Sequence, residues 1–263
     1  MTTPLAVIKK CIRGIATPFF QLRRKLPIDI EEITVKSKCL TDGLNGCRLA
    51  VIADLHLPDN IVGIDVLLTA LREAHLDGIL LAGDLINRYN LQLPAETAAF
   101  LNAISAIAPT FAIAGNHEIL SDHLTTYQDV LKNANIAFLC DRHATLFCKG
   151  ESLYIYGVCD TEKELPKKLP QPAVLLIHNP EHAVKACENG FICAVCGHAH
   201  GGQVRFGKRG LFAPGQGLFP RYISGCYVID AFPIIVSRGV GDSSLPIRIH
   251  NRPHLPIITL LCE

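Results

Sequence analysis

From about Cys47 onward, short apolar runs alternate with amphipathic helical patterns, and this alternation constrains the fold more than any other feature. The predicted strands are residues 48–53, 78–82, 110–114, 136–139, 153–158, 173–177 and 191–196. The predicted helices cover residues 62–75, 95–107, 122–133 and 181–188. The stretch from Gln203 is rich in glycine, proline and β-forming residues, which predicts hairpins. Alternating strands and helices followed by a β-rich tail predict an α/β domain built on mostly parallel strands.

The composition supports a globular chain with a substantial core. Of its 263 residues, 49% are hydrophobic and 19% are charged, which excludes wholesale disorder. The formal net charge is +1, so no overall basic balance favours nucleic acid, and we expect no nucleic-acid partner. We divide the chain into residues 1–45, a basic amphipathic arm with a lead-in strand, and residues 46–263, a single α/β domain.

The cysteine pattern indicates a reducing compartment. The chain has 11 cysteines, an odd number, scattered from Cys11 to Cys262, in a chain much longer than disulfide-stapled domains. We therefore expect a cytoplasmic protein without a disulfide framework. The longest uncharged stretch, residues 97–116, contains several polar residues and predicts a buried helix followed by a buried strand rather than a membrane span. We also expect no secretory signal, because no clean apolar region with a cleavage site follows Met1.

The N-terminal arm, residues 1–25, has six basic residues and no acidic one. Its apolar residues recur at spacings of three and four and would share one face of a helix: Leu5, Ile8, Ile12, Ile15, Phe19 and Leu22. Such a segment can lie in a membrane interface beside anionic headgroups, which would place the protein peripherally on the inner face of the membrane. It can equally pack on the protein's own core with a solvated basic face, and a transit peptide is a third reading.

Polar side chains able to bind metals follow five of the predicted strands. They are Asp54 and His56, Asp84, Asn116 and His117, His178, and His198 and His200. Ligands of open α/β sheets bind beyond the carboxyl ends of the strands, so we expect these side chains to share one rim. The residue types suit two divalent cations about 3.5–4 Å apart with a shared carboxylate. A mixed oxygen and nitrogen ligand set favours manganese, iron or zinc over calcium and magnesium, and manganese is the ion we expect.

The order and spacing of these blocks are similar to a known signature. Asp54-x-His56, Gly83-Asp84, Gly115-Asn116-His117, His178 and Gly197-His198-x-His200 resemble that of the calcineurin-like metallophosphoesterases. The resemblance covers about residues 45–263, and the block at 197–203 and the tail at 237–248 resemble the bacterial YaeI/YkuE-type phosphodiesterase branch. The fold that the resemblance implies is an α/β fold with a two-sheet β-sandwich core flanked by helices.

The resemblance also implies roles. Asp54, His56, Asp84 and His200 would hold one metal ion, and Asp84, Asn116, His178 and His198 the other, with Asp84 shared. His117 would not ligate and would protonate the leaving oxygen. The chain departs from the family pattern at Ala53, Pro58, Glu118 and Ala199, which affects the surroundings of the ligands but removes none of them. Histidines outside the motifs, namely His75, His123, His143, His182, His250 and His254, are expected at the surface or in loops.

Two classes of function remain. The first is a dimetal phosphoesterase that acts on phosphodiester or pyrophosphate bonds of a lipid or envelope-related substrate, with UDP-2,3-diacylglucosamine pyrophosphatase as an alternative. The second is a non-catalytic scaffold of the same fold, which would have lost ligands. The complete ligand set together with His117 favours the enzyme. Cys193 and Cys196 do not change this reading, because residues three apart on a strand point to opposite faces and cannot easily share an ion.

Overall fold

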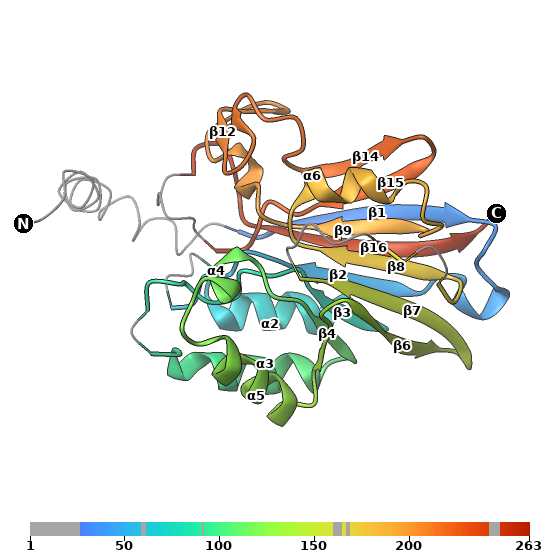
Figure 1. The fold of residues 1–263 in the computed structure, drawn as a ribbon, viewed down its shortest axis with the longest axis horizontal. Helices are drawn as coiled ribbons and strands as arrows, with labels where there is room; N and C mark the ends of the chain where they lie inside the picture. The colour runs from blue at the N-terminus through green and yellow to red at the C-terminus, as the bar shows by residue number, and fades with distance from the viewer. Residues whose placement is uncertain (1–26, 59–61, 91, 160–164, 167–168, 242–247) are drawn as a thin grey trace, which may run out of the picture.

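The computed structural model describes residues 27–58, 62–90, 92–159, 165–166, 169–241 and 248–263; the predicted arm, residues 1–25, lies outside them. Two six-stranded sheets lie face to face between layers of helices (Figure 1). The predicted two-sheet α/β fold is thereby confirmed.

The first sheet has the strand order β1-β16-β2-β3-β4-β5. Its strands are β1 (Asp29–Ser37), β2 (Arg48–Ile52), β3 (Gly78–Leu81), β4 (Thr110–Ala112), β5 (Ala137–Phe138) and β16 (His254–Cys262). Strands β2 to β5 are parallel, as the alternating pattern predicts. β16 pairs antiparallel with β2 and parallel with β1, so residues from both sequence-based divisions of the chain meet in this sheet.

The second sheet has the order β14-β15-β9-β8-β7-β6. Its strands are β6 (Arg142–Cys148), β7 (Glu151–Val158), β8 (Ala173–Ile177), β9 (Cys193–Cys196), β14 (Gly225–Ile229) and β15 (Phe232–Val236). The sequence pattern did not indicate β6, in which only Leu146 and Cys148 are fully buried. The tail forms the expected hairpins: β10 (Arg205–Phe206) pairs with β11 (Arg209–Gly210), and β12 (Phe212–Ala213) with β13 (Gly217–Leu218).

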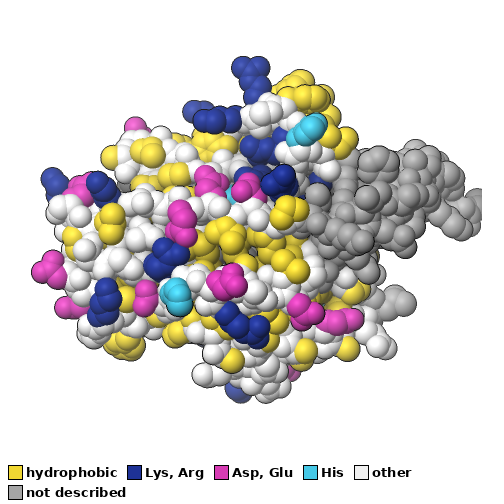
Figure 2. All heavy atoms as spheres, turned by 180° about the vertical axis from the view of Figure 1, so that it is seen from behind, with side chains coloured by type: hydrophobic (Ala, Val, Ile, Leu, Met, Phe, Trp, Pro, Cys, Tyr) yellow, Lys and Arg dark blue, Asp and Glu magenta, His cyan; other side chains and the backbone are white. Residues whose placement is uncertain are grey.

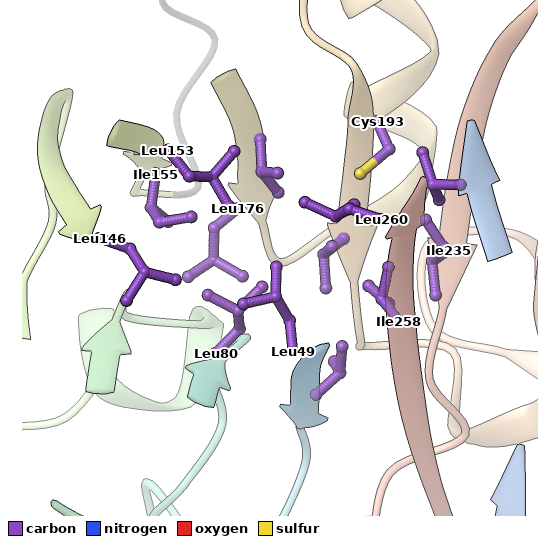
Figure 3. Close-up of a cluster of buried hydrophobic side chains, with 14 of the residues drawn as sticks. Leu49, Leu80, Leu146, Leu153, Ile155, Leu176, Cys193, Ile235, Ile258 and Leu260 are labelled. Carbon is purple, nitrogen blue, oxygen red and sulfur yellow. The ribbon is translucent and has the colours of Figure 1, made fainter. Parts of the chain in front are cut away.

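The main core fills the space between the two sheets. Strand periodicity divides each strand between two layers. In β2, for example, Leu49 and Val51 enter this core, whereas Ala50 and Ile52 face the helices. Figure 3 shows Leu80 from the first sheet and Leu176 from the second packing into the same apolar layer. β9 divides in the same way, so Cys193 and Cys196 lie in different clusters, as expected from their spacing.

Helices cover the outer faces of both sheets. α2 (Ile64–Glu73), α3 (Ala95–Ser105) and α5 (Leu124–Asn133) cover the first sheet (Figure 1). In α2 the buried leucines fall at positions 67, 68 and 71, the spacing of one helix face. The second sheet is covered by shorter elements: α6 (Pro180–Ala183) and the 3-10 turns η2 (Val184–Ala186) and η3 (His200–Gly202). The remaining elements are α4 (Asn116–Ile119) and the 3-10 turn η1 (Asp42–Leu44). The helix predicted at 181–188 is therefore two short turns.

Two further findings concern the cysteines and the helices. Cys140 and Cys159 form a disulfide, although no disulfide framework was expected, and the other cysteines of the described residues are free. Among the described helices, none has both the length and the apolar character needed to cross a bilayer.

Candidate dinuclear metal centre

The eight predicted site residues all follow strands at one edge of the sandwich. Those from 54 to 117 follow β2, β3 and β4 of the first sheet, and those from 178 to 200 follow β8 and β9 of the second. Both sheets therefore supply side chains to the same rim.

Backbone φ is positive at Asp54, His56, Asp84, His198 and His200. For residues other than glycine this left-handed conformation raises the conformational free energy, typically by about 1–3 kcal/mol each. Such strain is characteristic of functional sites.

A first group of potential ligands consists of Asp54, His56 and His200, whose ligand atoms all lie within 4.8 Å of one another. The Nε2 atoms of His56 and His200 are 3.2 Å apart, and His200 Nε2 is 3.6 Å from Asp54 Oδ1. All three residues are buried. The backbone N–H of His198 donates to both oxygens of Asp54, at 3.0 and 3.1 Å, which orients that carboxylate.

A second group consists of Asp84, His178 and His198. His178 Nε2 lies 3.2 Å from Asp84 Oδ2 and 3.2 Å from His198 Nδ1. The carbonyl of Ala82 can only accept, so the 2.7 Å contact to it places a proton on His178 Nδ1. Nε2 of His178 then faces the Asp84 carboxylate, where it can hold either a second proton or a cation.

Asp84 connects the two groups. Its Oδ2 is also 4.0 Å from His56 Nε2, and Asp84, His56 and His117 form a third overlapping group. Asn116, next to His117 in the chain, has a buried Oδ1 without a hydrogen-bond partner among the described residues. A buried amide oxygen without a partner is costly unless an unseen group satisfies it. These donors and acceptors fit two divalent cations that share Asp84.

Burial dominates the electrostatics of the rim. It raises the pKa of Asp54 to about 7 and lowers the pKa of His198 to about 4. It also lowers the pKa of His56 to about 3 and that of His200 below its usual range. Burial acts to raise the pKa of Asp84 too, but nearby His178 outweighs it and lowers that pKa. Burial acts to lower the pKa of His178 as well, but the Asp84 carboxylate outweighs it and raises that pKa to about 10. Without metal, the rim thus favours neutral His56, His198 and His200, an ionised Asp84 and a protonated His178, which must release a proton when a metal ion binds.

His117 lies at the mouth of the rim. Its ring centroid is 4.4 Å from that of His56 and 6.4 Å from that of Tyr89, which is 53% exposed. The backbone N–H of Arg88 donates to His117 Nδ1 at 3.3 Å. A neutral His117 therefore carries its proton on Nε2. Burial lowers the pKa of His117, so this neutral form prevails at pH 7.

Glu118 organises the loops around Asp84, a role that the sequence analysis did not assign. Its fully buried carboxylate accepts from the backbone N–H groups of Asp84, Ile86 and Gly115, at 2.8–2.9 Å. These bonds tie the loop after β3 to the loop after β4. The sequence signal was its place three residues after Gly115, where a carboxylate can cap the start of α4.

Residues 238–241 and 248–251, near the C-terminal end of the chain, contact the backbone and side chains of the rim residues. Arg248 Nη2 lies 3.4 Å from His200 Nδ1 and donates to the carbonyl of Arg238, and Asn251 Nδ2 donates to the carbonyl of His200 at 2.7 Å. Gly239 has φ +73°, and a Cβ there would lie 2.6 Å from the Cβ of Asp54. Sequence reasoning missed these supports, because Arg248 and Asn251 lie 48 and 51 residues from His200 in the sequence, and Gly239 lies farther still from Asp54.

Comparisons with known proteins agree with the geometry. The calcineurin-like phosphoesterase family model matches residues 47–202. The uncharacterized metallophosphoesterase YkuE of Bacillus subtilis is 25% identical over 248 residues, covering 89% of this chain and 85% of the relative. The phosphodiesterase YaeI of Escherichia coli is 28% identical over 228 residues, covering 81% of this chain and 82% of the relative. Sulfate thiohydrolase SoxB of Thermus thermophilus shares the fold, with a TM-score of 0.50, 12% identity and coverage of 82% of this chain and 57% of the other.

The chain belongs to the calcineurin-like phosphoesterase family. It is a metal-dependent phosphohydrolase, and its substrate is a phosphoester. Enzymes of this family use dimetal centres, and the two overlapping groups of potential ligands match that requirement.

Proposed function

We propose that the chain hydrolyses phosphodiester or pyrophosphate bonds of a substrate with a lipid part. The observation that carries the proposal is the position of Asp84 between two groups of potential metal ligands. In this proposal Asp54, His56, Asp84 and His200 hold one ion, and Asp84, Asn116, His178 and His198 hold the other. Manganese is the proposed ion, with zinc and iron as alternatives. Two divalent ions, when bound, lower the pKa of water and stabilise charge on phosphate oxygens.

The protein's own residues complete the chemistry. His117 faces the rim, and once it is protonated on both ring nitrogens it can give the Nε2 proton to the leaving oxygen and return to its neutral form, which is typically worth about 10²–10⁴-fold in rate. Glu118 holds the backbone on either side of Asp84 in place. The guanidinium of Arg88 lies over the ring of Tyr89, 4.7 Å from its centroid, and in this proposal it turns to a phosphate oxygen of the bound substrate.

Support for a lipid part comes from residues 203–223, which we call the hairpin lobe. Large apolar side chains are exposed on it: Phe206 at 70%, Phe212 at 38%, Leu218 at 68% and Phe219 at 73%. Residues 201–229 contain no acidic side chain, and Lys208, Arg209 and Arg221 are exposed among the aromatic groups. Figure 2 shows basic and hydrophobic side chains together on the projecting part of the molecule. Such a surface suits anionic lipid headgroups with apolar chains beside them.

The hairpin lobe borders the catalytic rim. A Cβ at Gly215, in the loop between β12 and β13, would lie 3.7 Å from His198 Nε2 and 3.9 Å from Asn179 Nδ2. A cavity of about 850 Å³ lies at the base of the lobe. Its lining includes more basic than acidic side chains: Arg205, Lys208, Arg209, Arg221 and Arg238 against Asp29 and Glu31. We propose that the lobe, together with residues 1–25, holds the enzyme peripherally on the inner face of the membrane.

A panel of substrates tests the proposal. The manganese-loaded protein is assayed on an aryl phosphomonoester, an aryl phosphodiester, a nucleotide diphosphate-sugar and UDP-2,3-diacylglucosamine. We expect the diester or a pyrophosphate to be hydrolysed fastest, and an acylated substrate to be hydrolysed faster than its non-acylated counterpart. A monoester that is fastest by a wide margin, with no gain from acyl chains, would overturn the assignment to lipid diesters or pyrophosphates.

A further inference from the structure

A second cluster of potential metal ligands lies at the opposite edge of the sandwich. Cys47 directly precedes β2, Asp77 directly precedes β3, and Cys148 is the last residue of β6. Because β2 and β3 are parallel, their first residues lie at the edge away from the catalytic rim. β6 belongs to the second sheet, so the cluster joins the two sheets.

The three side chains converge closely. The Cys47 and Cys148 sulfurs and a carboxylate oxygen of Asp77 all lie within 4.8 Å of one another. Both cysteines are buried, at 0% and 2% exposure, and neither is in the disulfide. The backbone N–H of Arg48 donates to Asp77 Oδ2 at 2.8 Å, which fixes the orientation of that carboxylate. Asp77 itself is only half-buried, which leaves a route to solvent.

The chemistry of these ligands differs from that of the catalytic rim. Thiolates are soft ligands that select zinc and similar ions, whereas the rim offers only nitrogen and oxygen. Two thiolates and one carboxylate form a three-ligand set that leaves a fourth position for water. Lys149 supplies a nearby positive charge that favours the thiolate form of both cysteines, and its Nζ donates to the carbonyl of Asn45 at 3.0 Å.

We propose that Cys47, Asp77 and Cys148 bind a thiophilic divalent ion, of which zinc is the natural example, separately from the catalytic pair. In the absence of an ion, burial raises the pKa of the Cys47 thiol, so binding is accompanied by release of thiol protons to solvent. The ion ties the start of β2 and β3 to the end of β6. Its effect is therefore on the cohesion of the two sheets rather than on the reaction.

Cobalt spectroscopy on the full-length reduced protein tests the proposal, because thiolate-to-cobalt charge transfer absorbs in the near ultraviolet and the catalytic residues contain no sulfur. We expect this band when metal-free wild-type protein is loaded with Co²⁺. It should vanish in Cys47→Ser and in Cys148→Ser. It should persist in the matched control Cys193→Ser, a buried cysteine that belongs to none of the potential metal-binding groups, and in Asp84→Asn, which disables the catalytic pair.

Two further measurements test the proposal even if a cysteine variant folds poorly. Asp77→Asn keeps both thiols and should weaken cobalt binding about tenfold or more, judged by titration of the same band. Zinc-loaded wild-type protein should carry one ion more per chain than Cys148→Ser, while the rate per catalytic pair stays unchanged. A wild-type protein without the near-ultraviolet band, or a band that survives loss of Cys148, would overturn the proposal.

Discussion

The two ends of the central strands use left-handed residues for different purposes. At the rim, Asp54, His56, Asp84 and His200 have positive φ and are buried. At the opposite edge, His75, Asn135 and Lys149 also have positive φ, but they are exposed. The exposed residues make turns and leave their side chains in water. The buried residues combine two free-energy costs, that of backbone strain and that of desolvating polar groups. Residues that lower stability in both ways are explained by function and not by stability.

This difference has a consequence for mutation. Polar groups buried at the rim lower stability in the absence of metal and create activity in its presence. Substitutions at the rim should therefore change activity most, whereas matched substitutions at the opposite edge should change only stability.

The largest effect is expected for Asp84→Asn. An amide cannot bridge two cations as a carboxylate does, so kcat on an aryl phosphodiester should fall about 10³-fold or more. Metal content measured on the purified protein should fall as well. Activity within tenfold of wild type at full metal content would show that Asp84 is not shared.

His117→Ala should have the next largest effect. Loss of a proton donor costs typically about 10²–10⁴-fold in kcat. Metal content should remain near the wild-type value, because His117 is proposed to act on the leaving group rather than on an ion. If the variant loses both metals, His117 belongs with the ligands, as its proximity to His56 and Asp84 would then indicate. A substrate with a good leaving group, such as a nitrophenyl ester, should show the smaller loss.

A matched pair of glycines compares the two ends directly. Gly239 at the rim has φ +73° and Gly150 at the opposite edge has φ +86°. Gly150→Ala meets no atom within 4 Å and should cost only backbone strain, about 1–2 kcal/mol. Gly239→Ala also collides with Asp54 and should cost about 3 kcal/mol or more and reduce activity. Urea unfolding and kcat on the same samples measure both effects, and equal losses of activity would contradict the comparison.

Much of the site was predictable because its residues directly follow strands. A strand pattern and a short motif are both local, so Asp54, Asp84 and His178 could be placed without knowing how the sheets pack. β1 and β16 could not be paired in this way, since their partners lie more than 200 residues apart. The same reason hid the supports from Arg248 and Asn251 and the Cys47, Asp77 and Cys148 cluster.

The expectation for His254, a histidine outside the motifs, is wrong. The sequence placed it at the surface or in a loop, but it is fully buried in β16. Its Nδ1 accepts from the backbone N–H of Arg238 at 3.2 Å, and its Nε2 lies 2.8 Å from a carboxylate oxygen of Glu31. The neutral ring with a proton on Nε2 satisfies both contacts. Only tertiary structure supplies these partners.

This histidine predicts a pH dependence of stability away from the rim. Burial lowers the pKa of His254 below its ordinary value of about 6.5, although Glu31 acts in the opposite direction. A folded-state pKa below the unfolded one makes protonation favour unfolding, so its contribution is fully present above pH 6.5 and declines as the pH falls below it. The hydrogen bond from His254 lowers the pKa of Glu31, whose own contribution is lost only at more acidic pH.

Between pH 7 and pH 5.5 the free energy of unfolding of the wild type should therefore fall relative to that of His254→Gln, which cannot titrate at this position. Urea unfolding across this range measures both proteins. Parallel curves for wild type and variant would show that other groups set the slope.

The smallest effect is expected at the hairpin lobe, where the contacts are with solvent in the isolated protein. Replacing Leu218 and Phe219 by serine removes exposed apolar groups without touching the core, so stability and kcat on a soluble aryl diester should stay near wild type. Sedimentation with anionic phospholipid vesicles should fall several-fold, and deletion of residues 1–25 or high salt should lower it further.

Val228→Ser is the matched control, because Val228 is 66% exposed on β14, outside the lobe. If Val228→Ser weakens vesicle binding as much as the lobe variant does, the contact is a general property of exposed apolar groups and the lobe has no special role. If only the lobe variant loses binding, the rim and the membrane contact lie on neighbouring parts of one surface, which would account for the gain in rate that we expect from acyl chains.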